Sequence, residues 1–287
     1  MRTIAYDEVV QRVAALCIAA AYELPADVWT ALETALDRES EPRPRRILQA
    51  LLDNARIAAE ERIPICQDTG LAVVFVELGA EVRIAPPEEH LDATLADAIH
   101  EGVVRGYEEG LLRKSVVADP LGARTNTGTN GPAVIHVSIV PGDRLRLSVM
   151  TKGGGCENKS RFRMFNPTED RHAVAGWIVR AVAEAGADAC PPFVVGVGIG
   201  GDFEQCCLLS KKALLRSLGS RHGERLYAEM EAELLEAINA LDVGPQGLGG
   251  RTTALAVQIE TAPCHIASLP VAVNIECHAH RHKTAEL

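Results

Sequence analysis

Eight cysteines are the residues of this chain with the widest range of possible chemistry. They are Cys17, Cys66, Cys156, Cys190, Cys206, Cys207, Cys264 and Cys277. Four disulfides would suit a small secreted protein, but a chain of 287 residues buries roughly 73% of its surface and needs no covalent cross-links. No pair has the C-x-x-C spacing of a local metal motif. The thiols are therefore core residues, redox groups or metal ligands, and their spacing leaves all three open.

Two further segments break the pattern of ordinary helices and strands. The first, Cys66-Gln67-Asp68-Thr69-Gly70, places small polar side chains before an apolar run, although a buried cysteine followed by a simple turn would look the same. The second is KGGGCENKS at 152–160. Its three glycines let backbone N–H groups approach an anion, and Lys152 adds a positive charge. Tight loops without a ligand remain the alternative.

Other candidates carry weaker chemistry. Gly196-x-Gly198-x-Gly200-Gly201 follows a strand but lacks the GxGxxG spacing of a dinucleotide site. The alternating histidines 278, 280 and 282 predict a solvated or locally bonded tail, because no paired ligand motif completes a zinc site. Cys17 and the adjacent pair Cys206 and Cys207 are predicted to be core or near-core residues. There is no G-x-S-x-G motif for serine catalysis.

Composition excludes two large classes of partner. With 29 basic and 39 acidic residues the net charge is −10, and aromatic residues make up 4% of the chain. Both observations argue against nucleic-acid binding. No apolar run approaches the ~20 residues of a membrane span. Residues 13–21 resemble the core of a signal peptide, but Asp7 and Glu8 precede them and their periodicity is helical. We expect a cytoplasmic protein.

The elements that must position these residues alternate between helix and strand. Residues 7–61 predict three helices separated at Pro25 and at 42–44. Further helices are expected at 88–112, from 166–169 to 185, at 203–216 and at 223–241, and strands at 71–78, 133–140, 144–150, 193–199, 254–259 and 271–275. Pro141-Gly142-Asp143 predicts a hairpin turn. Without repeats or linkers, the pattern predicts one mixed α/β domain over residues 1–287 with a mixed sheet and a helical N-terminal layer.

Six segments, taken in order, resemble the class I iron–sulfur fumarate hydratases, and more closely the alpha-type catalytic chain that these share with L-tartrate dehydratase. They are CQDTG at 66–70, NTGTN at 126–130, KGGGCENKS at 152–160, ACPP at 189–192, GPQGLGG at 244–250 and APCHIASLPVAVNIEC at 262–277. Each is weak alone, but six in the right order are highly specific. The resemblance runs from about residue 10 to about residue 283.

The resemblance implies a 4Fe–4S cluster held by only three cysteines. By motif these are Cys66, Cys190 and Cys277. Thiolates are the usual ligands of such clusters. With three ligands for four irons, one iron keeps an open position and can act as a Lewis acid. Cys156 stands where the fumarate hydratases often have serine, and it is expected not to bind the cluster.

The implied reaction is the reversible removal of water from (S)-malate to give fumarate, a step of the tricarboxylic acid cycle. A dicarboxylate substrate needs cations and N–H donors. The matching positions assign substrate binding to Gln67, Asp68, Arg113, Lys152 and Gly155. Asp68 would also orient the substrate or an iron-bound hydroxyl, and His265 would have a supporting acid–base or hydrogen-bonding role. Apart from the resemblance, Arg113 would be a surface arginine at the end of a helix.

The resemblance also implies a partner. Single-chain members carry a second, beta-type domain after this one, so the chain is expected to be an alpha subunit that pairs with a separate beta-type hydro-lyase subunit in a hetero-oligomer. Alone it would have little or no activity. Three alternatives stay open: an L(+)-tartrate dehydratase alpha subunit, suggested by the CHAHRHKT end, a non-enzymatic iron–sulfur binding or redox-sensing protein, and a zinc or disulfide scaffold.

Overall fold

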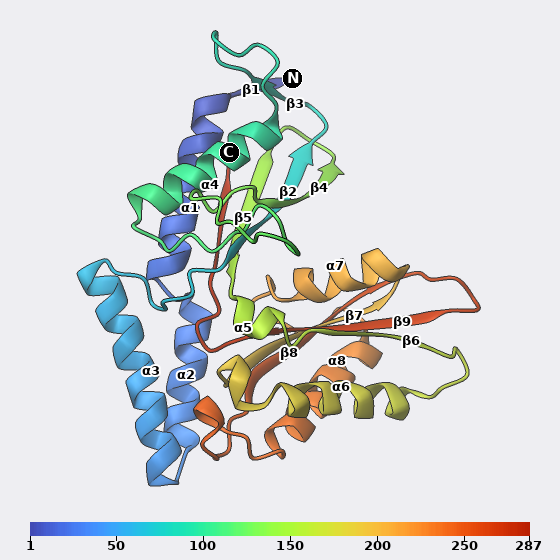
Figure 1. Cartoon of the computed structure of the whole chain (residues 1–287). Helices are drawn as coiled ribbons and strands as arrows, with labels where there is room; N and C mark the ends of the chain where they lie inside the picture. The colour runs from blue at the N-terminus through green and yellow to red at the C-terminus, as the bar shows by residue number, and fades with distance from the viewer. The chain divides into compact units, whose positions relative to one another are not determined.

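The computed structural model in Figure 1 describes residues 1–287. The chain forms two compact units, neither of which is continuous in sequence. Unit 1 comprises Met1–Pro25, Ile57–Gly154 and Arg281–Leu287, and unit 2 comprises Ala26–Arg56 and Gly155–His280. Each unit has a mixed sheet and a core of its own, as expected for the mixed α/β class. The single domain over residues 1–287 remains a prediction.

Unit 1 is built on a four-stranded sheet with two packed helices. The strand order is β10-β5-β2-β4, with β2 parallel to β4 and antiparallel to β5. Helices α1 and α4 pack against each other beside this sheet (Figure 1). A separate pair of short parallel strands, β1 and β3, was not predicted. The bounds are β1 Arg2–Ala5, α1 Tyr6–Tyr22, β2 Leu71–Gly79, β3 Val82–Ala85, α4 Leu95–Glu109, β4 Val134–Val140, β5 Leu145–Lys152 and β10 His282–Glu286.

Helix α1 is the core helix of unit 1. Its predicted apolar face is buried, and burial raises the pKa of the Cys17 thiol to about 12, so this thiol stays protonated as a core residue. Two glycines of α4 allow close contact, because a Cβ at Gly102 would lie 2.7 Å from the Cβ of Val13 and one at Gly106 would lie 2.8 Å from Ala14 O. By length and composition alone Tyr6–Arg38 could cross a membrane, a test that a buried core helix also passes.

The predicted hairpin between residues 133–140 and 144–150 is wrong. Both strands exist, but β2 lies between β4 and β5 and pairs with each of them. The connecting turn passes the end of β2, where Gly79 N donates to Arg144 O and Ala80 N donates to Val140 O. Local periodicity located the strands, whereas their pairing depends on a third strand more than 50 residues upstream in the chain.

Unit 2 has helices on both faces of its sheet. The strand order is β6-β9-β7-β8, with β7 parallel to β8 and antiparallel to β9. Figure 1 shows α7 on one face and α6 and α8 on the other. The strand β6 was not predicted. The bounds are α2 Ala26–Arg38, α3 Pro42–Glu61, α5 Gly154–Glu157, β6 Arg161–Phe165, α6 Arg171–Ala185, η1 Gly186–Ala189, β7 Phe193–Gly200, α7 Phe203–Ala213, α8 Arg225–Asn239, η2 Pro245–Gly247, β8 Ala254–Ala262 and β9 Leu269–Glu276.

The glycines of β7 are explained by packing. A Cβ at Gly196 would lie 2.0 Å from Ser210 O, and one at Gly198 would lie 2.1 Å from Cys206 O. Helix α7 therefore rests directly on the backbone of β7. Cys206 is fully buried there, and burial raises the pKa of its thiol to about 12. The glycine run that partly resembles a dinucleotide fingerprint thus seats a helix on a strand.

Of the two states expected for the C-terminal histidine segment, solvated or locally bonded, the solvated one does not hold for His280. His280 is fully buried, Arg281 is 2% exposed, and β10 follows as an antiparallel partner of β5. Histidines alternate here with small or charged residues, so the segment has no apolar periodicity that would predict a strand. The strand forms by pairing at the edge of a sheet that is built from distant parts of the sequence.

Gly196→Ala should strongly destabilise the fold, because its methyl group would overlap the Ser210 carbonyl oxygen. Overpacking of this kind costs about 3 kcal/mol, which lowers Tm by roughly 6–12 °C. Gly219→Ala is the matched control, since a Cβ there meets nothing within 4 Å. Thermal denaturation followed by circular dichroism measures both. Equal Tm values for the two variants would contradict the packing argument.

Candidate functional site

Asp68 joins three distant segments of unit 1. Its Oδ1 accepts a hydrogen bond from Gly70 N at 3.0 Å, and its Oδ2 accepts one from Gly154 N at 2.8 Å. Its backbone carbonyl accepts a third bond from Arg281 Nη1 at 2.5 Å. A simple turn accounts for the Gly70 bond but not for the other two. The CQDTG segment, the start of the KGGG segment's helix and the buried Arg281 just before β10 therefore meet at this one residue.

The backbone after Asp68 is fixed from several sides. Tyr107 Oη donates to Thr69 O at 2.7 Å, and Thr69 Oγ1 donates to Arg113 O at 2.7 Å. Asn130, from the NTGTN segment, is fully buried and donates to Gly70 O at 3.1 Å. Burial raises the pKa of Tyr107, so its phenol remains a hydrogen-bond donor. These bonds give NTGTN a positioning role next to CQDTG.

Lys152 is a buried cation at the end of β5. It is 2% exposed and pairs with Leu71, the first residue of β2. Gly70 makes this approach possible, because its φ is +76° and a Cβ there would lie 2.8 Å from Lys152 O. The strained turn thus brings the end of CQDTG against the start of KGGG.

The other predicted substrate residues of unit 1 are exposed, and so is Gly155. Arg113 follows the buried Leu112, and its side chain is open to solvent. Gln67 is exposed, with its Oε1 accepting the Cys66 thiol at 3.4 Å. Gly155 lies in unit 2, on the short helix α5 that starts at Gly154. The segments of these residues are thus located, while their substrate contacts remain predictions.

In unit 2, Cys277 follows directly on the last residue of β9 and lies beside a second thiol. The Oε1 atom of Glu276 accepts bonds from Cys156 Sγ at 3.3 Å, from Cys277 Sγ at 3.9 Å and from Cys277 N at 3.4 Å. The two sulfurs and a Glu276 oxygen all lie within 4.8 Å of one another. Cys156 is 3% exposed and Glu276 is fully buried. Sequence reasoning missed Glu276, whose only signal was a charge within an otherwise apolar strand.

Cys190 lies beside the segment that carries Cys277. Its backbone is left-handed, with φ of +56°, and its carbonyl accepts a bond from His278 N at 3.2 Å. The GPQGLGG segment supports it, because Gln246 donates to Pro191 O through both N, at 2.8 Å, and Nε2, at 2.9 Å. Unit 2 therefore brings the backbone of Cys190 next to His278, the residue that follows Cys277. Cys66 belongs to unit 1, and the set of three ligands remains a prediction.

His265 lies away from these thiols. It sits in the exposed loop before β9, where its Nδ1 accepts a bond from Ala267 N at 3.1 Å. Cys277 follows the other end of β9, and a strand of 8 residues spans about 26 Å. Within this chain, His265 and Cys277 are separated by the length of that strand.

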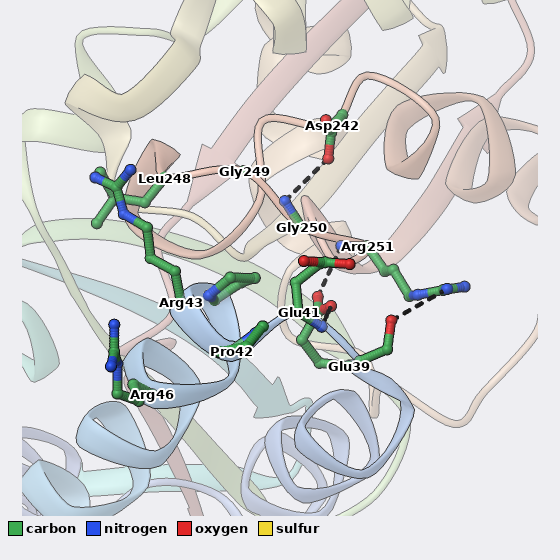
Figure 2. A pocket seen from close by; sticks show the side chains of 12 residues that line it. Glu39, Glu41, Pro42, Arg43, Arg46, Asp242, Leu248, Gly249, Gly250 and Arg251 are labelled. Atoms are coloured by element: carbon green, nitrogen blue, oxygen red, sulfur yellow. Dashed lines mark hydrogen bonds between the residues drawn. The ribbon is translucent and has the colours of Figure 1, made fainter.

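A separate cavity of about 590 Å³ lies between the start of α3 and the loop at 242–251 (Figure 2). Glu39, which is 3% exposed, lines this cavity. Its carboxylate accepts hydrogen bonds from Glu41 N at 3.0 Å and from Arg251 N at 2.8 Å, which hold the two segments together. Gly250 has φ of +116°, and a Cβ there would lie 2.6 Å from the Cβ of Pro44. None of the predicted site residues lines this cavity. The last glycine of GPQGLGG therefore serves packing.

Comparison with known proteins decides the family. The family model described as fumarate hydratase (Fumerase) matches residues 10–286. The chain belongs to the fumarate hydratase family. It is 41% identical, over 91% of both chains, to a provisionally named L(+)-tartrate dehydratase subunit alpha of Methanocaldococcus jannaschii. It is 35% identical to the L(+)-tartrate dehydratase subunit alpha of Escherichia coli strain K12, over 91% of this chain and 84% of that one. The fumarate hydratase family to which the chain belongs is a family of hydro-lyases.

Asp68→Ala should lower the stability of the chain, because it removes the acceptor of two backbone N–H groups. Bonds to a charged group are worth about 1.5–3 kcal/mol each, so we expect a loss of about 3 kcal/mol and a Tm lower by roughly 6–12 °C. Asp68→Asn keeps one acceptor oxygen and should fall between. Glu88→Ala, at an exposed position, is the control. A Tm for Asp68→Ala equal to that of the control would show that the two hydrogen bonds accepted by the Asp68 carboxylate do not stabilise unit 1.

Proposed function

We propose that the chain is the alpha subunit of an iron–sulfur hydro-lyase that reversibly removes water from a 2-hydroxydicarboxylate. The observation that carries the proposal is the family match over residues 10–286, and the backbone hydrogen bond from His278 N to Cys190 O in unit 2 supports it. Such a subunit would be a cytoplasmic enzyme.

The cofactor is proposed to be a 4Fe–4S cluster held by Cys66, Cys190 and Cys277. The donor chemistry fits, because none of the three cysteines is in a disulfide and none is fully buried. When bound, the cluster would supply an iron with an open position that acts as a Lewis acid on the substrate hydroxyl. Cys190 directly follows the short helix η1, and Cys277 directly follows β9, so both residues lie at the ends of regular elements.

The residues of unit 1 supply the polar contacts that the reaction needs. Lys152 and Arg113 are the proposed cations for the substrate carboxylates, with a guanidinium suited to a bidentate contact. The Asp68 carboxylate has a fixed orientation because Gly70 N and Gly154 N hold one oxygen each. It is therefore suited to orient a substrate hydroxyl. Gln67 and Gly155 complete the proposed set, and His265 is assigned a supporting proton-transfer or hydrogen-bonding role.

A separate beta-type subunit is the proposed partner. The relatives from M. jannaschii and E. coli are named as alpha subunits, which supports a beta subunit for this chain too. We propose that the two chains form a hetero-oligomer and that the beta subunit supplies the remaining substrate contacts.

The cluster assignment predicts the result of three single substitutions. Cys66→Ser, Cys190→Ser and Cys277→Ser should each lower bound iron and sulfide from about four per chain after anaerobic reconstitution. Activity with the beta subunit should fall at least about 100-fold, because the Lewis acid is lost. Cys264→Ser, at an exposed cysteine, should change neither. A cluster that survives all three substitutions would refute the ligand set.

The substrate is proposed to be (S)-malate, with L(+)-tartrate as the second candidate, which the names of the relatives favour. The two differ by one hydroxyl group, which a site built to bond that hydroxyl distinguishes strongly. The reconstituted complex with its beta subunit is assayed anaerobically with each substrate, and the kcat/KM values are compared. A ratio above about 100 in either direction assigns the reaction. A complete cluster with no turnover of either substrate would favour the redox-sensing alternative.

A further inference from the structure

Cys156, Glu276 and Cys277 form a group that the proposed cluster ligands do not explain. The helix α5 carries Cys156, and Glu276 and Cys277 lie at the end of β9. Their ligand atoms, two sulfurs and a carboxylate oxygen, lie within 4.8 Å of one another. The whole group belongs to unit 2, and two of its three members are more than nine-tenths buried.

The separations between these atoms match those around a tetrahedral metal ion. Zinc lies about 2.3 Å from a thiolate sulfur and about 2.1 Å from a carboxylate oxygen, so sulfur and oxygen on one tetrahedral ion are about 3.6 Å apart. The observed distances from Glu276 Oε1 are 3.3 Å to Cys156 Sγ and 3.9 Å to Cys277 Sγ. These values lie on either side of the expected separation, so small side-chain movements suffice.

The charges of the group also favour a cation. As thiols, both cysteines are directed at the same carboxylate oxygen. Two thiolates and a carboxylate without a cation would place three negative charges in a buried space, which is strongly unfavourable. One divalent ion that replaces the two thiol protons leaves a net charge of about −1 on the site and satisfies all three ligands.

The position of Cys156 is supported by its neighbour. The Glu157 carboxylate forms an ion pair with Lys211 of α7 through one oxygen. Its other oxygen accepts a bond from Asn274 Nδ2 of β9 at 3.2 Å. These contacts join α5 to both β9 and α7, so Cys156 is held against the end of β9 before any ion binds.

We infer that Cys156, Glu276 and Cys277 bind one borderline-soft divalent cation, such as Zn²⁺ or Fe²⁺, when the chain holds no cluster. Two thiolates and a carboxylate leave the fourth position to water, as in open zinc sites. Cys277 is also a proposed cluster ligand, so the single ion and the cluster exclude each other, and Zn²⁺ in this site blocks cluster assembly. This competition, unlike the binding of the ion itself, rests on the proposed function.

Anaerobic titration of the cluster-free full chain with Co²⁺ tests the site. Thiolate-bound Co²⁺ gives sulfur-to-metal charge-transfer absorption, and we expect one ion per chain with the intensity of two thiolates. Cys156→Ser should remove about half of that intensity and weaken binding at least about tenfold. Glu276→Gln provides a second variant that keeps both sulfurs. Cys264→Ser, which removes an exposed thiol outside the group, should behave as the unsubstituted chain.

Cluster assembly and Co²⁺ binding, measured on the same variants, distinguish a failure of this inference from a failure of the proposed function. Cys156→Ser should still assemble a complete cluster from iron and sulfide, and excess Zn²⁺ should slow that assembly in the unsubstituted chain but not in this variant. Unchanged Co²⁺ absorption and affinity in both Cys156→Ser and Glu276→Gln would overturn the site. A chain that binds Co²⁺ through Cys156 but never assembles a cluster would overturn the proposed function and leave the site standing.

Discussion

The carboxylate of Asp68 is the contact on which the arrangement of unit 1 depends. Its two oxygens each accept a different backbone N–H, one from its own turn and one from Gly154, which lies 86 positions away in sequence. The bond from Gly70 N is part-buried, so its loss would leave a desolvated donor unpaired, whereas the bond from Gly154 N lies at the surface. Tyr107 and Asn130 also hold the Gly70 carbonyl, and Arg281 holds the Asp68 carbonyl.

Close approach of backbones is the second constraint, and it recurs in both units. Gly70 admits the end of β5, Gly102 admits α1, and Gly196 admits α7, each at distances that no Cβ could tolerate. At Gly70 and Gly196 the nearest atoms belong to the backbone of the neighbouring element, and at Gly102 the nearest atom is the Cβ of Val13. These glycines are thus contact points between elements, whereas Gly154 in KGGG donates its amide N–H to the Asp68 carboxylate.

The sequence predicted most elements but few of their partners. Helices and buried strands have strong periodicity, so α1, α8, β2 and β7 were located within a few residues. The hairpin failed because the ladder of β5 is with β2, and no local signal encodes that choice. The edge strands β6 and β10 were missed because they lack an apolar run.

For the candidate site, too, the sequence predicted some of the residues but not their contacts. The resemblance selected Cys190 and Cys277, and the structure joins their segments through the bond from His278 N to Cys190 O although 87 positions separate the two cysteines. Spacing could not have done so, because a fold-assembled site has no sequence period. Cys156 is predicted not to bind the cluster, and it lies beside Cys277, with Glu276 Oε1 accepting a hydrogen bond from each sulfur. His265 lies at the opposite end of the same strand, a separation that the count of 12 residues did not reveal.

The strand β10 has a consequence for the order of events during synthesis. Unit 1 needs residues 281–287 to complete its sheet, and these are made only after all of unit 2. Until then the outer edge of β5 has no partner, although Leu145, Leu147 and Val149 are fully buried in the finished fold. An unpaired strand edge invites pairing with other chains. The nascent protein therefore exposes this edge during the translation of residues 155–280, and the closing contact between Leu287 and Leu145 is among the last to form.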